Sequence, residues 1–314
     1  MANVSGKTLV RTSPVLNVSP MFQSALICTD LSDGLQRLAG FIPELAESGL
    51  KKLIFLHTVP LSEELEIPRP DKERLQAACD RLSQMLTNTP AGVEVIVDVQ
   101  CGKPIDHILQ ANKTHQPSVV LVGVSSANRL EEKLFGSTSM ELCKRLNTPI
   151  LTLRPQLVST YTREELALRC RHLFRYVMVP YDGSPASAYL VQQVKALAQQ
   201  PNSPLEACLL CWVIETGGRR ELRSDNAVEQ AQAALAVIKA ELSGLGIDVS
   251  VEVRSGEPVL QLLLAAQERD ISAIATSSGS LGKLISWSVP SLTAEILSRS
   301  WHPVLYFPSA KAMV

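Results

Sequence analysis

The sequence contains one internal repeat. Asp30 and Asp182 lie in matching segments 152 residues apart, and Pro149 and Pro303 lie in matching segments 154 residues apart. Four pairs of segments match in this way: SALICTDLS with YVMVPYDGS, KKLIFLHTV with EACLLCWVI, VEVIVDVQCGKP with IDVSVEVRSGEP, and NTPILTL with SWHPVLYF. Because the four pairs keep nearly the same separation, the chain is predicted to be a duplicated domain.

Each repeat alternates short apolar runs with longer amphipathic segments. In the first repeat, strands are expected at residues 24–30, 51–59, 93–100, 118–123 and 149–153. The runs LIFL, VVLV and ILTL are nearly continuous in apolar residues, which is typical of parallel strands covered by helices on both faces. Helices are expected between them, at 37–49 and 71–88 in the first repeat. The pattern predicts an α/β fold with two tandem doubly wound, five-stranded parallel-sheet domains of the Rossmann-like kind, related by a pseudo-two-fold axis.

The repeats set the expected domain boundaries. We expect an N-terminal tail at 1–21, domain 1 at 22–155, a linker at 156–173 and domain 2 at 174–309, each domain having its own core. The tail shows no structural pattern. Two interpretations of it are possible: disorder, or packing on a partner. Thr162 and Glu165 have the spacing of a capping box, so the linker is predicted to contain a short helix.

Composition excludes several classes of function. The chain has 30 Lys and Arg residues against 31 Asp and Glu residues, which gives no electrostatic reason to expect nucleic acid or an anionic membrane as a partner. No secretory signal and no run of ~18 apolar residues is visible, so we expect no membrane span and a cytoplasmic location.

The seven cysteines favour a reducing compartment as well. Their odd number and apolar surroundings indicate reduced core residues rather than a disulfide framework. Cys208 and Cys211 have CxxC spacing, but they lie in the predicted strand ACLLCWVI, where their side chains point to opposite faces. A core role is therefore favoured over a redox or zinc role.

Candidate binding residues gather at one edge of each predicted sheet. Ligands of doubly wound folds bind outside the carboxyl ends of the strands, where the strand order reverses. Asp30 and Asp182 end the first strand of each repeat, and Gly123 and Thr276 end the fourth. In the first repeat, Gly136, Ser137 and Thr138 precede the helical run MELCKRL, and Thr138 and Glu141 have capping-box spacing. The unpaired N–H groups at such a helix start are suited to a phosphate.

The motif Gly123-x-x-Ser126-x9-Gly136-Ser137 closely resembles the G-x-x-G-x9-G-[S/T] signature of the universal stress protein family. The segments YDGS and IFLHTV, and a last strand preceded by Pro, support the resemblance, which covers about residues 22–155 and 174–309. It implies an adenine nucleotide alpha hydrolase-like fold in a tandem family member. It also implies a regulatory binding function in stress responses, without an enzymatic activity.

The resemblance also implies roles for individual residues in domain 1. In nucleotide-binding members, the Asp after the first strand holds the nucleoside, while the glycine loop and the helix start hold the phosphates, often with a divalent metal. Carried over, these are Asp30, then Gly123, Ser126, Gly136, Ser137 and Thr138, with ATP or AMP as the ligand and Mg²⁺ as the metal. Ser126 replaces the second glycine of the signature, and its Cβ restricts positive φ.

Domain 2 departs further from the signature. Asp182 and Gly279 match, but Thr276 replaces the first glycine, and Val289 and Pro290 replace the Gly-Ser pair. Pro290 has no N–H to offer a phosphate. The sequence therefore predicts that domain 2 does not bind ATP in the family manner.

Alternative interpretations remain open at this stage. Asp30 and Asp182 could simply fix turns, and Val289-Pro290 could simply begin a helix. His57 lies in an apolar strand and is interpreted as a hydrogen-bonded core residue. Instead of a nucleotide-binding module, the chain could be a nucleotide-independent scaffold or hold another small ligand. A slow ATPase or an autophosphorylating protein using Ser137 or Thr138 is a third alternative.

The partner expected first is the chain itself. The family pairs its domains through the last strand, which predicts a seam between residues 150–153 of domain 1 and 304–307 of domain 2. These runs are apolar and would otherwise be exposed edge strands. Association of two chains and an unidentified regulatory protein partner are further expectations.

Overall fold

The computed structural model describes residues 22–32, 34–61, 71–86, 88–124, 137–215, 224–277 and 291–308. The predicted tail therefore lies outside the described residues. So do Ser126 and Gly136 in domain 1, and Gly279, Val289 and Pro290 in domain 2.

Both domains alternate strands and helices, as the repeat predicts. Domain 1 consists of β1 (Ser24–Thr29), the 3₁₀ helix η1 (Leu35–Gly40), α1 (Ile42–Glu47), β2 (Lys52–Val59), α2 (Lys72–Met85), β3 (Glu94–Cys101), α3 (Pro104–His115), β4 (Val119–Gly123), α4 (Ser137–Arg145) and β5 (Ile150–Leu153). The linker forms α5 (Pro155–Thr160) and α6 (Arg163–Arg171). Domain 2 consists of β6 (Tyr176–Pro180), α7 (Pro185–Ala198), β7 (Ala207–Ile214), α8 (Ser224–Ser243), β8 (Asp248–Ser255), α9 (Pro258–Glu268), β9 (Ala273–Ser277), α10 (Leu292–Arg299) and β10 (Val304–Phe307).

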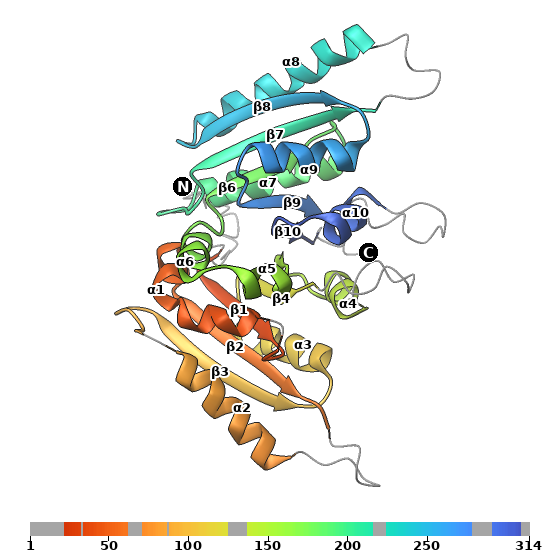
Figure 1. The fold of residues 1–314 in the computed structure, drawn as a ribbon. Coiled ribbons are helices and arrows are strands. Elements are labelled where there is room, and N and C mark those ends of the chain that lie inside the picture. The colour runs from red at the N-terminus through yellow and green to blue at the C-terminus, as the bar shows by residue number, and fades with distance from the viewer. Residues whose placement is uncertain are drawn as a thin grey trace, which may run out of the picture.

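The strands form one ten-stranded sheet in the order β3-β2-β1-β4-β5-β10-β9-β6-β7-β8. Strands within a domain pair in parallel, whereas β5 and β10 pair antiparallel at the seam. Figure 1 shows the two domains joined along this seam, with α2 and α8 near opposite outer ends. Both the doubly wound fold and the predicted pairing of the last strands are confirmed.

The seam has pseudo-two-fold symmetry. Leu151 of β5 lies opposite Leu305 of β10. These two residues are 154 positions apart, which is the separation of Pro149 and Pro303 in the repeat. On either side, Ile150 pairs with Tyr306 and Thr152 with Val304. A rotation that exchanges the two repeats therefore maps the seam onto itself.

The core differs between the two faces of the sheet. On one face, a single buried cluster runs through both domains and includes Phe55, Leu151, Leu305 and Leu210 together with residues of η1, α1, α6, α7 and α8. On the other face, α3 and α4 cover a cluster in domain 1, and α9 and α10 cover another in domain 2. The expectation of one core per domain holds for this second face only, because pairing of β5 with β10 makes the first face continuous.

The helix expected at 37–49 is divided in the structure. η1 ends at Gly40 and α1 begins at Ile42, with Phe41 between them. Pro43 occupies the first turn of α1, where its missing N–H is tolerated. The same residue could not lie inside a continuous helix without removing a hydrogen bond, so the apolar spacing alone gave the wrong boundary.

The linker is docked onto both domains. Thr162 accepts a hydrogen bond from the Glu165 N–H and the Glu165 carboxylate accepts one from the Thr162 N–H, which confirms the predicted capping box. On the domain 1 side, Arg37 donates to the carbonyl of Tyr161, and Arg171 of α6 pairs with Glu47 of α1 at 2.9 Å. The linker thus has more helix than the single short one predicted.

Candidate functional site

Each half of the sheet has its own topological switch point. In domain 1, the chain moves outward from β1 through β2 to β3 on one side, and through β4 to β5 on the other. In domain 2 the same reversal occurs between β6 and β9. Loops diverge at these two points and leave room for a ligand beyond the carboxyl ends of the strands.

Two predicted residues of domain 1 lie at the same edge of the sheet. Asp30 directly follows β1 and is exposed, and Gly123 is the last residue of β4. β1 and β4 are neighbours, with Ile27 opposite Leu121. The structure therefore places Asp30 and Gly123 beside the domain 1 switch point, while their role in binding stays a prediction.

The other predicted residues of domain 1 belong to the loop and helix after β4. Ser126 and Gly136 lie outside the described residues, and Ser137 is the first residue of α4. A capping box of Thr138 and Glu141 would make Thr138 the N-cap of this helix. The helix begins before Thr138, so this residue lies in the first turn and the N-cap interpretation is wrong. Glu141 instead pairs with Arg145 one turn later, at 2.7 Å. Ser137 and Thr138 therefore occupy the first turn of α4, where backbone N–H groups lack helical partners.

The turn after the first strand has the same geometry in both domains. An oxygen of Asp30 accepts from the Ser32 N–H at 2.7 Å, and an oxygen of Asp182 accepts from the Ser184 N–H at 2.9 Å. Both aspartates therefore fix a local turn, as the alternative interpretation of the sequence held.

The residue inside this turn was missed by the sequence argument. It is Gly183 in domain 2, with φ of 76°, and Leu31 in domain 1, with φ of 65°. A leucine in the left-handed region is strained. Leu31 is nevertheless buried, in a cluster with Val59 and Leu82. The signal available in the sequence was the alignment of Leu31 with a glycine.

His57 also lies beside this edge of domain 1. Its side chain is buried, and Nδ1 lies 2.9 Å from the carbonyl oxygen of Thr29, the last residue of β1. The interpretation of His57 as a hydrogen-bonded core residue is confirmed. The contact ties the carboxyl end of β2 to the carboxyl end of β1, next to Asp30.

A pocket of about 280 Å³ opens at the switch point of domain 2. It is bounded by the carboxyl ends of β6, β7 and β9 and by the starts of α7, α9 and α10. The residues that line it include Pro180, Asp182, Ser187, Val213, Pro258, Thr276 and Thr293. The sequence argument treated this domain as the degenerate one. The structure shows that loss of the signature residues still leaves a cavity at the family position.

Two polar groups of this pocket are notable. The hydroxyl of Thr276 is buried and makes no hydrogen bond within the part of the chain that the structure describes. Partial burial would raise the pKa of the Asp182 carboxyl, but hydrogen bonds from Ser184, Ser187 and the Asp182 N–H together hold that pKa below its ordinary value. A buried hydroxyl without a partner is unfavourable in the free protein and available to a ligand.

The phosphate end of the domain 2 pocket is occupied by the protein's own contacts. Ser291 is the N-cap of α10, and its hydroxyl accepts from the Ala294 N–H at 3.2 Å. The Thr293 hydroxyl donates to the carbonyl of Ser277 at 3.0 Å. One N–H group at this helix start, that of Ala294, is thus already bonded to a side chain, while the loss of ATP binding in this domain stays a prediction.

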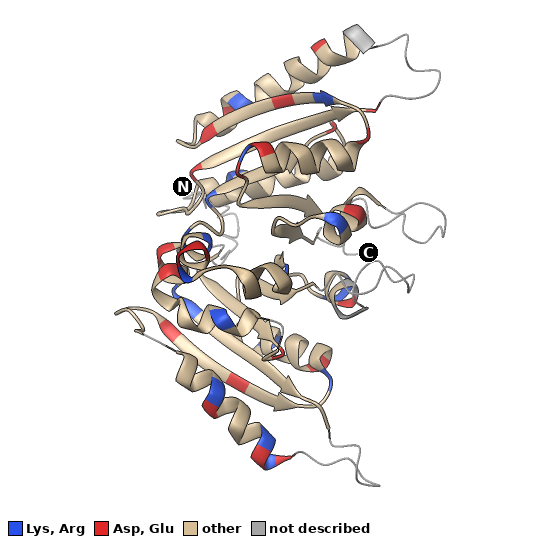
Figure 2. Cartoon of the chain, in the orientation of Figure 1, with Lys and Arg blue, Asp and Glu red and all other residues tan. Residues whose placement is uncertain are grey.

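Other chemistries find little support in the described residues. Within them, no group of three or more His, Cys, Asp or Glu side chains could hold a metal ion, and no helix is long and apolar enough to cross a membrane. Figure 2 shows acidic and basic residues interspersed along the ribbons of both domains. Cys208 and Cys211 belong to clusters on opposite faces of the sheet, which confirms their core role.

The fold and the two switch points define a tandem α/β protein with two doubly wound, parallel-stranded domains. The model of the universal stress protein family matches residues 21–154 and again residues 173–308. The chain belongs to the universal stress protein family, with two such domains in tandem. A search of the curated proteins found no match.

Two solved structures with TM-scores above 0.5 agree on the fold. A universal stress protein from Archaeoglobus fulgidus DSM 4304 is 18% identical, with a TM-score of 0.62 and coverage of 92% of this chain and 99% of that chain. A functionally unknown protein from Pseudomonas aeruginosa PAO1 is 12% identical, with a TM-score of 0.54 and coverage of 91% and 92%. A universal stress protein in complex with cAMP is 18% identical, with a TM-score of 0.35, and covers 44% of this chain and 98% of its own.

Proposed function

We propose that the chain is a non-catalytic regulatory module of the cytoplasm in which domain 1 binds an adenine nucleotide, ATP or AMP. The observation that supports this most is that Asp30 follows β1 and Gly123 ends the neighbouring strand β4, at the switch point of domain 1. Only domain 1 retains Gly136 and Ser137 at the following helix. The nucleoside would be held at Asp30 and the phosphates at the first turn of α4.

A divalent metal would depend on the nucleotide. Mg²⁺ is commonly held by one or two carboxylates together with substrate phosphates. Because no cluster of three metal-binding side chains stands among the described residues, Mg²⁺ would be held chiefly by the phosphates. Asp30 is the carboxylate that domain 1 places at this edge. We therefore expect Mg²⁺ to bind with the nucleotide and not without it.

Calorimetric titration of the full chain with ATP and AMP tests the proposal. Asp30→Ala should weaken binding by roughly tenfold or more, since a hydrogen bond to a charged group contributes about 1.5–3 kcal/mol. Asp182→Ala is the matched control, because it removes the equivalent turn from domain 2 and should leave ATP affinity unchanged. Gly136→Val should abolish binding. The proposal fails if wild-type chain does not bind millimolar ATP, or if the two aspartate variants behave alike.

The absence of catalysis is part of the same proposal. It requires that ATP incubated with the full chain releases phosphate no faster than ATP alone, and that the chain gains no phosphate. Release that disappears in Ser137→Ala would instead support a slow ATPase. Incorporation of phosphate at Ser137 or Thr138, read by mass spectrometry, would support autophosphorylation.

A second candidate function concerns the pocket of domain 2. Its volume of about 280 Å³, the unpartnered Thr276 hydroxyl and the capped start of α10 favour an uncharged ligand without phosphates. Adenosine is a suitable probe, and Thr276→Val should weaken its binding while Asp30→Ala should not. If Thr276→Val has no effect on a probe that does bind, the buried hydroxyl is not part of the site.

A further inference from the structure

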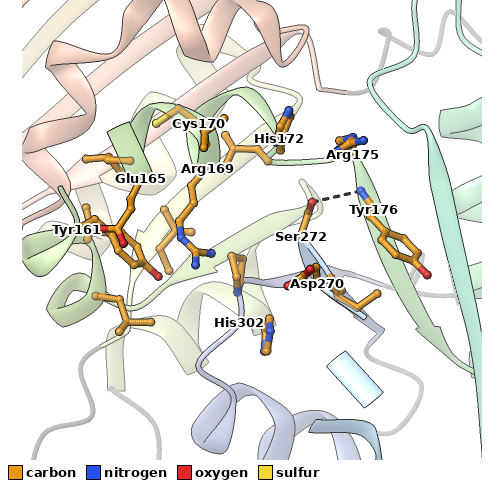
Figure 3. Close-up of a pocket in the computed structure, with 18 of the residues that line it drawn as sticks. Tyr161, Glu165, Arg169, Cys170, His172, Arg175, Tyr176, Asp270, Ser272 and His302 are labelled. Atoms are coloured by element: carbon orange, nitrogen blue, oxygen red, sulfur yellow. Dashed lines mark hydrogen bonds between the residues drawn. The ribbon is translucent and has the colours of Figure 1, made fainter. Parts of the chain in front are cut away.

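A larger cavity lies away from both switch points. It has a volume of about 590 Å³ and is bounded by the linker helices α5 and α6 on one side and by the amino ends of β6, β9 and β10 on the other. Tyr161 and Arg169 of the linker face Asp270, Ser272 and His302 of domain 2 across it (Figure 3). Ligand cavities of proteins are commonly of this size and are frequent at domain interfaces.

The pseudo-two-fold axis supplies an internal comparison. A second cavity, of about 560 Å³, is lined by Ser118 and Pro149 of domain 1 and by Phe307 of domain 2. Ser118 and Pro149 correspond in the repeat to Ser272 and Pro303, which line the linker cavity. The strand ends of the two cavities are thus equivalent positions of the repeat, whereas the linker helices line only the first cavity.

Two of the differences give the linker cavity an aromatic ring and an imidazole, whereas the second cavity has Lys113 and Tyr189 of its own. Asn147 and Thr148 line the cavity on the domain 1 side, whereas Trp301 and His302 occupy the corresponding positions in the linker cavity. The linker contributes Leu168 as a further apolar wall. Trp301 is 57% exposed and Leu168 is 50% exposed, and both belong to the few large hydrophobic residues left at the described surface. Exposed aromatic and aliphatic side chains at a cavity rim typically mark a binding surface.

Two arginines of the cavity form no ion pair among the described residues. Arg169 lies over the ring of Tyr161, 4.4 Å from its centroid, and forms no ion pair within the described residues. Its guanidinium projects into the cavity between Tyr161 and His302 (Figure 3). Arg154 is buried and donates to main-chain carbonyls, at 2.8 Å to Ser300 and 3.0 Å to Leu297. Neither arginine is neutralised by a carboxylate.

The carboxylates that line the cavity are largely engaged elsewhere. Glu206 pairs with Arg175 at 2.7 Å, and Glu165 accepts from the Thr162 N–H at 2.7 Å. Asp270 is the remaining carboxylate. Burial lowers the pKa of His302 and Arg169 lowers it further, and together they outweigh Asp270, which raises it. Glu165 and Asp270 keep their charges, but among the described residues neither forms an ion pair with Arg169.

We propose that the linker cavity binds a small aromatic organic anion, whose acidic group is held by Arg169 and whose ring packs against Trp301. Arginine presents a planar set of donors that matches a carboxylate or a sulfonate. An exposed Trp supplies the apolar surface that such a ligand needs at little entropic cost. This inference does not depend on the proposed function, because the cavity is at the opposite ends of the strands from the nucleotide site.

A pair of fluorescent probes tests the proposal on the full chain. The anionic probe is 1-anilinonaphthalene-8-sulfonate, and the neutral probe is N-phenyl-1-naphthylamine, which has the same rings without the sulfonate. Arg169→Gln should weaken binding of the anionic probe by roughly tenfold and leave the neutral probe unchanged. Trp301→Ala should weaken both. Saturating ATP should displace neither probe.

A matched control lies on the same helix. Arg163 of α6 stacks over the ring of Phe41 at 5.5 Å but does not line the cavity, so Arg163→Gln should bind both probes as wild type does. Asn147→Ala, in the equivalent cavity, should do the same. Thermal unfolding of each variant shows whether it is folded. Equal loss in Arg163→Gln and Arg169→Gln, unchanged binding in both, or displacement by ATP would overturn the proposal.

Discussion

Phe22 and Phe174 stack face to face, with ring centroids 4.3 Å apart and ring planes 14° from parallel. They are 152 positions apart, as Asp30 and Asp182 are, so each occupies the same place in its own repeat. Together with Leu151 opposite Leu305, the pair lies on the pseudo-two-fold axis. The symmetry of the sequence is thus expressed as direct contact between equivalent side chains.

The stacked phenylalanines should contribute a large part of the free energy that holds the two domains together. Both are buried, and Phe22 also lies 6.4 Å from Phe307. Phe22→Ala or Phe174→Ala should lower the free energy of unfolding by about 3–5 kcal/mol, measured in urea. The double variant should lose less than the sum, by roughly 0.5–1.5 kcal/mol. Val237→Ala, at a side chain that is 61% exposed, is the control and should change little.

Arg154 is expected to hold α10 at the seam. Its guanidinium donates to the carbonyls of Leu297, Ser298 and Ser300, at the end of that helix, where carbonyls have no helical partner. Arg154→Met keeps the apolar stem but removes these donors, so we expect a loss of about 2–4 kcal/mol in the free energy of unfolding. Arg175→Met breaks only an exposed pair with Glu206 and should cost less than about 1 kcal/mol. Similar losses in the two variants would contradict a capping role.

The repeat made the fold predictable from sequence. Blocks at nearly one separation predicted two similar domains. The resemblance to a family that pairs through its last strand predicted the seam, and apolar runs such as ILTL suited that pairing. Asp30 and Gly123 could be placed at one edge because the carboxyl ends of parallel strands meet there.

Other features depend on contacts that no local pattern encodes. The left-handed conformation of Leu31 follows from the turn that Asp30 fixes and from burial of its side chain under α2. The sequence around Arg154, at the end of domain 1, gives no sign of its contacts with α10, which form only because β5 pairs with β10. The linker cavity depends on α6 packing against α1 so that it lies opposite the amino ends of β6, β9 and β10. The sequence did not predict the pocket of domain 2, because the signature describes residues that contact a phosphate and not the space between the helices.

The cysteines should divide into two groups of reactivity. Burial raises the pKa of the Cys143, Cys170, Cys208 and Cys211 thiols to about 12, so their reactive thiolate forms are scarce at neutral pH. Cys28, Cys79 and Cys101 are only partly buried. In the native chain, a thiol reagent should modify these three first, and the remaining four should react only after urea is added. Mass spectrometry after digestion identifies the sites, and early labelling of Cys208 would contradict the prediction.

Asp182 should make the free energy of unfolding depend on pH in the acidic range. Hydrogen bonds from Ser184 and Ser187 outweigh the effect of burial and lower the carboxyl pKa below 3.8 in the folded chain. At pH values between the folded and unfolded pKa, the unfolded chain binds more protons, so stability falls as pH falls. The contribution is fully present above pH 3.8 and is lost below it, as pH drops through the folded pKa. Asp182→Asn should therefore flatten the dependence of the free energy of unfolding on pH below about 4.

Ser184→Ala separates the hydrogen bond from the charge. It removes the hydroxyl donor but keeps both Asp182 and the Ser184 N–H bond, so its pH profile should fall between those of wild type and Asp182→Asn. Urea unfolding at a series of pH values from about 2 to 6 gives the three curves. Because the Asp182 turn borders the domain 2 pocket, a ligand that contacts this carboxylate should shift the wild-type curve and leave the Asp182→Asn curve unchanged. Parallel curves for wild type and Asp182→Asn would show that the turn contributes nothing to acid sensitivity.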